Sequence, residues 1–200
     1  MPTIFSAPSV SFSKRDRTFA NMTQIPRWIL PAAISVTVPL PSYAVQYLSV
    51  SQAQKLCFPE ADQFVAAHIK FTPAQVTAIE AASGEKQLLH GQEIWHAMKG
   101  EKLQGFFIVD YVIGKHLVID YAVALSPAGS VKQIEILNYR ESYGGEIRNA
   151  DWRKQFLGKT ARSHFALNEG ITNISGATLS CRHVTEGVRR VLATYEVCLK

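Results

Sequence analysis

The sequence lacks the residue patterns that define several common functional classes. Its three cysteines form no Cys-x-x-Cys pair and have no zinc-finger spacing. It contains no Gly-x-Ser-x-Gly elbow and no evident pair of carboxylates suited to hydrolysis. It also lacks internal repeats and low-complexity linkers. These absences argue against a hydrolase, a zinc-binding module and a repeat protein.

Strong basic character is also missing from most of the chain. The net charge is +5 over 200 residues, and the first 44 residues carry four basic side chains against one acidic side chain. No basic stripe with interleaved aromatic residues is present, so the sequence predicts no nucleic-acid partner.

An apolar segment near the N-terminus predicts export. Residues 22–44 contain Arg27, then an apolar run, then the small-x-small ending Ser42-Tyr43-Ala44, which is the pattern of a secretory signal peptide. We therefore expect residues 1–44 to be a leader, cleaved after Ala44 or retained as an anchor. The protein is then expected in the periplasm or at the outer face of the inner membrane.

The rest of the chain predicts one α+β domain, in which helices cover an antiparallel sheet of several strands. Capping and stop signals delimit two early helices, and a change of apolar period marks strands in the middle of the chain. The predicted helices are 49–58, 72–84, 150–157 and 181–195, and the predicted strands are 94–98, 105–113, 117–125 and 131–139. We expect an N-terminal helical and strand region over 45–100 and a second region over 101–200.

The most informative segment is Ser175-Gly176-Ala177-Thr178-Leu179-Ser180, which directly precedes the last predicted helix. Gly176 and Ala177 keep the Thr178 hydroxyl approachable, and a helix N-terminus attracts phosphate through its free N–H groups. Thr178 has no sequence neighbour that would make it a strong nucleophile, so modification by another enzyme is favoured. The alternative is an ordinary Ser/Thr helix cap.

A second candidate segment is the loop over residues 141–149. It begins Glu141-Ser142-Tyr143-Gly144-Gly145, where the glycines permit positive φ and close approach of a ligand and Tyr143 offers an aromatic face. Arg148, Asn149 and Trp152 are weaker candidates for contact with the same ligand. The alternative is a long turn with solvated charges.

The remaining cysteines and histidines favour structural roles. Cys57, Cys181 and Cys198 allow one disulfide and one free thiol, and each is best interpreted as a small buried apolar residue. Cys181 and His183 point to different faces of a helix, which disfavours a metal site. His183 and Arg182 can instead help to neutralise a phosphate.

These motifs together resemble the FMN-binding domain family, which includes flavinylated subunits of the sodium-pumping NADH:quinone oxidoreductase and the Rnf complex. Residues 175–178 match the core of its signature, D-x-x-[ST]-G-A-[TS], and residues 141–146 correspond to its E-T-P-G-L-G loop. The stretch from about Gly105 to Ala193 looks like this domain. Thr172 stands where the signature has Asp, and Tyr143 stands where the loop has Pro.

The resemblance implies a cofactor, a site and partners. A flavin transferase would use FAD to attach FMN to Thr178 through a phosphoester, with residues 141–145 and 175–180 near the cofactor. The protein would then relay electrons between redox partner proteins, some of them in a membrane complex, as a carrier without a catalytic residue of its own. The alternative, motivated by Thr172, is a non-redox accessory module that holds FMN non-covalently or not at all.

Overall fold

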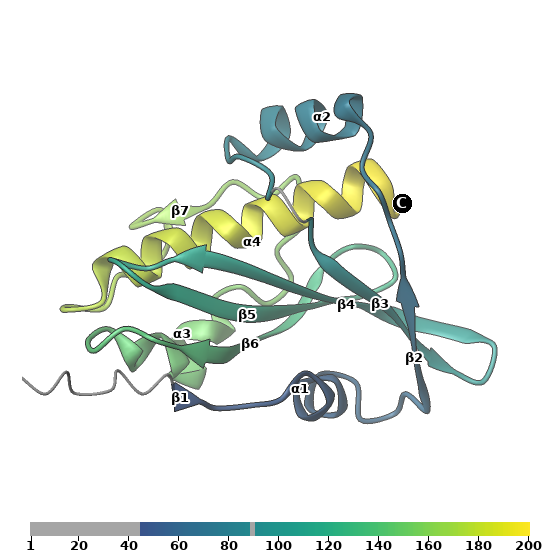
Figure 1. Ribbon diagram of the computed structural model, residues 1–200, viewed down its shortest axis with the longest axis horizontal. Coiled ribbons are helices and arrows are strands. Elements are labelled where there is room, and N and C mark those ends of the chain that lie inside the picture. Colours follow the sequence, from purple (N-terminus) through teal and green to yellow (C-terminus); the bar gives the residue numbers. More distant parts are fainter. Residues whose placement is uncertain (1–44, 89–90) are drawn as a thin grey trace, which may run out of the picture. The chain divides into compact units, whose positions relative to one another are not determined.

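The protein is built on one antiparallel sheet, seen in a computed structural model that describes residues 45–88 and 91–200 (Figure 1). The predicted signal peptide lies outside these residues. Six strands follow the order β1-β6-β5-β4-β3-β2. Their bounds are β1 Val45–Gln46, β2 Gln63–Ala67, β3 Glu93–Lys99, β4 Lys102–Ile113, β5 Val118–Leu125 and β6 Val131–Tyr139. The predicted antiparallel meander is confirmed, and β1 and β2 extend it at its two edges.

Four α-helices accompany the sheet. They are α1 Val50–Cys57, α2 Pro73–Ser83, α3 Ala150–Lys154 and α4 Thr178–Cys198, and a 3₁₀ turn, η1, spans Gly145–Arg148. Ser49 and Thr72 each form a capping box with the glutamine three residues later, which fixes the starts of α1 and α2. Two further strands, β7 Ala166–Leu167 and β8 Gly170–Ile171, form a short parallel pair. The α+β class is therefore confirmed.

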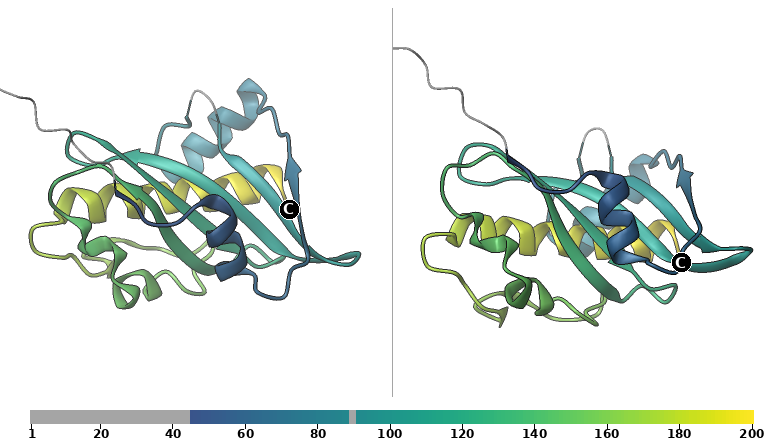
Figure 2. Two further views of the ribbon diagram at one scale, coloured as in Figure 1. Left: turned by 60° about the horizontal axis from the view of Figure 1, so that its bottom comes forward. Right: turned by 90° about the horizontal axis from the view of Figure 1, so that it is seen from below.

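The sheet separates two apolar clusters. Alternation along β4 sends Phe106 and Ile108 to the face covered by α4, and Phe107 to the face covered by α1. Figure 2 shows α1 in front of the sheet with α4 behind it. The apolar side chains of α4, which recur every three or four residues, are buried as this spacing predicts, and Val184 and Val188 are among those fully enclosed. The long helix thus has its whole apolar side fixed against the sheet.

Close packing of α4 depends on Gly187 and on one buried ion pair. A Cβ at Gly187 would lie 2.1 Å from the Tyr121 hydroxyl, so no larger residue fits there. The Arg190 guanidinium donates to both Asp110 oxygens, and the Tyr121 hydroxyl also donates to Asp110. Burial raises the pKa of Tyr121 well above its ordinary value, so this hydroxyl stays protonated.

Two of the expected helix boundaries are wrong. The last helix begins at Thr178 rather than at Cys181, and the third ends at Lys154 because the chain turns towards Gly158. Strand β2 was not expected, because its alanines have weak strand propensity. No disulfide joins the cysteines, which are all free. Cys57 and Cys181 are buried as predicted, whereas Cys198 is only partly buried.

Within the described residues, no helix combines the length and the apolar character needed to cross a bilayer.

Candidate functional site

The start of α4 has no side-chain cap. Ala177 occupies the N-cap position and offers no side-chain acceptor, so the N–H groups of the first turn have no intrahelical partner. The interpretation of the Ser/Thr-rich segment as a cap is therefore wrong. The Thr178 hydroxyl instead accepts a hydrogen bond from Asn173 Nδ2 at 3.0 Å, and Ser175 is exposed. The helix consequently presents uncompensated N–H groups and a half-buried hydroxyl at the same end.

A hollow of about 490 Å³ lies at this end of the helix. Its lining includes eight of the eleven residues that the sequence singled out, which come from two segments far apart in the chain. These residues are Glu141, Ser142, Tyr143, Gly176, Ala177, Thr178, Leu179 and Ser180. The volume lies within the range of roughly 300–1,000 Å³ found for small-molecule sites. The other three, Ser175, Gly144 and Gly145, are not part of the lining.

Gly144 explains how the two segments meet. Its φ is +90°, and a Cβ there would lie 2.5 Å from the Tyr139 hydroxyl and 3.1 Å from Ser180 Oγ. Gly145 has no positive φ, and its nearest neighbours would be 3.9 Å from a Cβ. The expected positive φ is thus confirmed for Gly144 and wrong for Gly145. The close approach at Gly144 is to the protein itself, because it lets the loop lie directly on the start of α4.

Tyr139 ties that contact together. Its hydroxyl donates to the Tyr143 carbonyl and shares a hydrogen bond of 3.0 Å with Ser180 Oγ. Burial raises the pKa of the Tyr139 phenol above its ordinary value, which keeps the donor protonated. Ser180 is buried in this contact, so Thr178 is the more accessible of the two hydroxyls on the first turn of α4.

Glu141 holds a neighbouring turn. Its carboxylate accepts the backbone N–H groups of His116 and Leu117, in the turn between β4 and β5. Partial burial raises the pKa of Glu141, but these donors outweigh burial and bring that pKa below its ordinary value. The Glu141 carboxylate is therefore ionised and occupied by backbone hydrogen bonds, which hold the turn at the edge of the hollow.

That turn supplies two lining residues that sequence reasoning missed. Lys115 and His116 are exposed side chains of the hollow, and they are the basic residues of its lining. They lie about 60 residues before Thr178 in the chain, and no local pattern marks them. Only the pairing of β4 with β5 and the Glu141 contact bring them to the helix start. They make the hollow suitable for an anion.

Exposed apolar side chains gather around the same hollow. Of seven large hydrophobic residues exposed in the described part, Tyr143 (86%) and Leu179 (40%) line the hollow. Ile113 (59%) and Leu117 (39%) flank the turn that holds Lys115. Exposed apolar patches of this kind often mark ligand or partner contacts. The hollow therefore joins a phosphate-compatible helix start to apolar walls.

Several weaker candidates lie elsewhere. Trp152 is buried and donates to the Thr172 carbonyl at 2.8 Å, so it cannot form a wall of the hollow. Arg148 stacks over the Tyr47 ring at 3.9 Å, and Asn149 caps α3. His183 Nδ1 lies 2.6 Å from the Ile113 carbonyl, where it joins α4 to the end of β4. Trp152, Arg148 and Asn149 thus make contacts within the protein and do not line the hollow.

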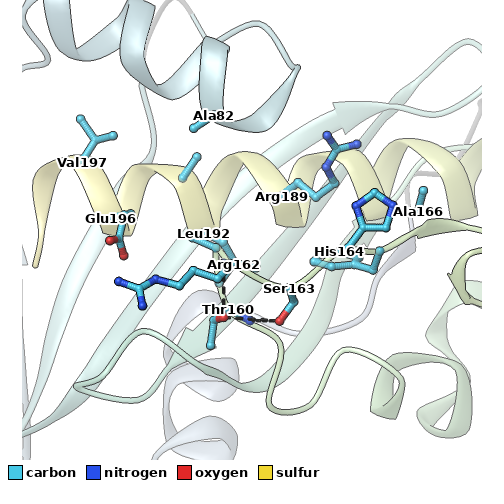
Figure 3. Close-up of a pocket in the computed structure, with 13 residues that line it drawn as sticks. Ala82, Thr160, Arg162, Ser163, His164, Ala166, Arg189, Leu192, Glu196 and Val197 are labelled. Atoms are coloured by element: carbon cyan, nitrogen blue, oxygen red, sulfur yellow. Dashed lines mark hydrogen bonds between the residues drawn. The ribbon is translucent and has the colours of Figure 1, made fainter.

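A second hollow, of about 380 Å³, lies between α2, the C-terminal half of α4 and residues 160–166 (Figure 3). Arg162, Arg189 and Leu192 line it, and none of the predicted site residues does. Leu192 is fourteen residues from Thr178, which at 1.5 Å per residue is roughly 20 Å along the helix.

In the part of the chain described here, no three His, Cys, Asp or Glu side chains are grouped to hold a metal ion.

Fold and site together define a small α+β domain with an anion-compatible pocket at the start of its last helix. The family model described as FMN-binding domain matches residues 114–193, which include the turn at Lys115, the loop at Tyr143 and Thr178. This part of the chain therefore belongs to the FMN-binding domain family, which supports a flavin-binding protein. No curated protein sequence matches the chain significantly.

Proposed function

We propose that this protein is an extracytoplasmic electron carrier whose FMN is joined to Thr178 through a phosphoester. The observation that carries the proposal is the place of the Thr178 hydroxyl, on the first residue of an uncapped helix and in the wall of the hollow. Free N–H groups at a helix start favour phosphate. A phosphate on Thr178 would lie beside those groups.

The rest of the hollow supports the same assignment. Lys115 and His116 carry donors that would balance the phosphate charge. Tyr143 and Leu179 offer apolar surface to the ring system, which supplies the electron-transfer chemistry when it is bound. Ile113 and Leu117 extend this surface to the outside of the molecule, where a redox partner protein would dock.

A covalent bond would suit an exported location. Outside the cytoplasm a dissociable cofactor is lost by dilution, since occupancy depends on its free concentration. A flavin transferase that uses FAD would attach FMN once, and retention would then be independent of concentration. The predicted signal segment at residues 22–44 supports this setting.

The first prediction concerns attachment. The full chain, exported in a host that carries a flavin transferase, should gain the mass of one FMN that survives denaturation, and Thr178→Ala should remove it. Fragmentation of the tryptic peptide over residues 163–182, which contains Ser175, Thr178 and Ser180, should place the added mass on Thr178.

The matched control for this prediction is Thr172→Ala, because Thr172 is exposed and lies six residues before Thr178. Thr172→Ala should retain the added mass. The proposal fails if wild-type protein from a competent host carries no added mass, or if the mass lies on another residue.

A second candidate function is a non-redox module that binds FMN without a covalent bond. It is favoured by Thr172, which replaces the signature Asp, is exposed, and uses its backbone N–H and carbonyl to contact Gln155 and Trp152. In that case added FMN would raise the melting temperature in a saturable way while denatured protein stayed colourless.

A further inference from the structure

Asn173 is the side chain that contacts the Thr178 hydroxyl. Its Nδ2 donates to Thr178 Oγ1 at 3.0 Å, whereas its Oδ1 is buried and has no hydrogen-bond partner within the described residues. A buried polar atom without a partner costs free energy, so packing alone does not account for an amide at this position. Thr172, at the position of the signature Asp, instead faces solvent.

The two ends of an amide have nearly the same shape and opposite hydrogen-bonding roles. A half-turn of the Asn173 amide would place Oδ1 against Thr178 Oγ1, and the hydroxyl would then donate to it. A free hydroxyl can donate or accept. An esterified oxygen has lost its proton, so it can only accept. Asparagine is therefore able to keep the contact both before and after an ester forms.

We infer that Asn173 is the positioning residue for FMN attachment to Thr178, an inference that rests on the proposed function. Before attachment, Asn173 holds Thr178 Oγ1 through a hydrogen bond, in which Nδ2 donates to Oγ1 as in the structure or, after a half-turn of the amide, Oδ1 accepts the hydroxyl hydrogen. Either contact turns a lone pair of Oγ1 towards the hollow. In the transfer, Oγ1 forms a bond to the FMN phosphorus of FAD, the pyrophosphate bond breaks, AMP leaves, and the hydroxyl proton passes to a base of the transferase. Afterwards Nδ2 donates to the ester oxygen.

The chemistry makes different predictions for two variants. Asn173→Ala removes both roles, so Oγ1 loses its fixed orientation. Asn173→Asp keeps an acceptor for the hydroxyl, but its negative charge would then lie beside the negative phosphoester. We therefore expect Asn173→Ala to slow attachment, and Asn173→Asp to permit attachment but to yield a loaded protein with a lower melting temperature than loaded wild type.

The second prediction is tested with purified unmodified full chain, a flavin transferase, Mg²⁺ and FAD, by following flavin fluorescence in denaturing gels. Asn173→Ala should lower kcat about tenfold or more while KM for the acceptor protein stays within about twofold, because orientation rather than docking is lost. Thr172→Ala, the adjacent exposed residue, should react at the wild-type rate.

A readout independent of attachment uses the unmodified protein. Three-bond NMR couplings should give one dominant χ1 rotamer for Thr178 in wild type and in Asn173→Asp, and rotamer averaging in Asn173→Ala. Far-UV circular dichroism establishes that each variant is folded. If Asn173→Ala fails to fold, three measurements still test the role of Asn173. These are the Thr178 rotamer in the wild type, the attachment rate of Asn173→Asp and the melting temperature of loaded Asn173→Asp.

The inference is overturned if Asn173→Ala reacts at the wild-type rate, if only KM rises, or if Thr178 averages over rotamers in the wild type. A wild-type chain that never gains FMN would overturn the proposed function as well. A wild-type chain that gains FMN while Asn173→Ala does so equally fast would leave the proposed function intact and remove only the role of Asn173.

Discussion

At the scale of single residues, Gly144 decides whether the loop can reach the start of α4. Any other residue at this position would have to keep a backbone φ of +90°, which is unfavourable for residues with a Cβ. Its Cβ would also overlap the Tyr139 hydroxyl. The third prediction is that Gly144→Ala lowers the free energy of unfolding by about 2–4 kcal/mol, through left-handed strain and overpacking together. Urea titration followed by circular dichroism measures this difference.

Gly145→Ala is the matched control, because Gly145 has no positive φ and the atoms nearest to a Cβ at this position would be 3.9 Å away. Its free energy of unfolding should stay close to that of wild type. Equal losses in the two variants would contradict the special role of Gly144.

Single residues also mark the limit of sequence reasoning about the site. The segments around Thr178 and Tyr143 could be predicted, because small residues and glycines occur there in contiguous patterns. Lys115, His116 and Asn173 could not, because their roles depend on contacts made by folding: the Glu141 contact with the β4–β5 turn, and the hydrogen bond from Asn173 to Thr178. Trp152 was misplaced because its burial depends on packing against Phe156 and Thr172.

At the scale of elements, the contact between α4 and the sheet depends on Gly187. The fourth prediction is that Gly187→Ala lowers the free energy of unfolding by about 3 kcal/mol or more, because its Cβ would overlap the Tyr121 hydroxyl. The same substitution in a Tyr121→Phe background should cost less, since the overlapping oxygen is gone. A double-mutant cycle of urea titrations measures the coupling.

Glu186→Ala is the control for this prediction, because Glu186 is the preceding residue of α4 and is only half-buried. It should change stability little. If Gly187→Ala were as mild as Glu186→Ala, the distance between α4 and β5 would not be set by Gly187.

Elements with a strong periodic pattern could be predicted from sequence, whereas short or edge elements could not. The α4 stripe and the strands of the meander have clear periods, and Thr72, Pro73 and Gly84 delimit α2 as expected. Strand β2 has only one neighbour and mostly exposed side chains, so its sequence has little apolar alternation. The start of α4 was missed because Ala177 gives no capping signal.

At the scale of the whole molecule, the reactivity of the three cysteine thiols depends on how far the fold excludes solvent from them. Burial raises the pKa of Cys57 to about 12, and it also raises the pKa values of Cys181 and Cys198. Only Cys198 is partly exposed. The core thiols are thus both inaccessible and protonated at neutral pH.

The fifth prediction is that a disulfide reagent at pH 8 modifies one thiol of the native protein quickly and the other two slowly. Absorbance of the released thiolate counts them, and denaturant should make all three react at once. Cys198→Ser should abolish the fast phase. A fast phase that persists in Cys198→Ser would mean that the fold opens around Cys57 or Cys181.

The first turn and the interior of α4 should differ in how fast their amide hydrogens exchange with solvent. Thr178 is the first residue of a 21-residue helix whose interior side chains, such as Val184 and Val188, are fully enclosed. Amide hydrogens in such a segment exchange with solvent only when the molecule opens globally, while the first turn can fray by itself. An attached group would therefore sit at the boundary between the fastest- and slowest-exchanging parts of one helix.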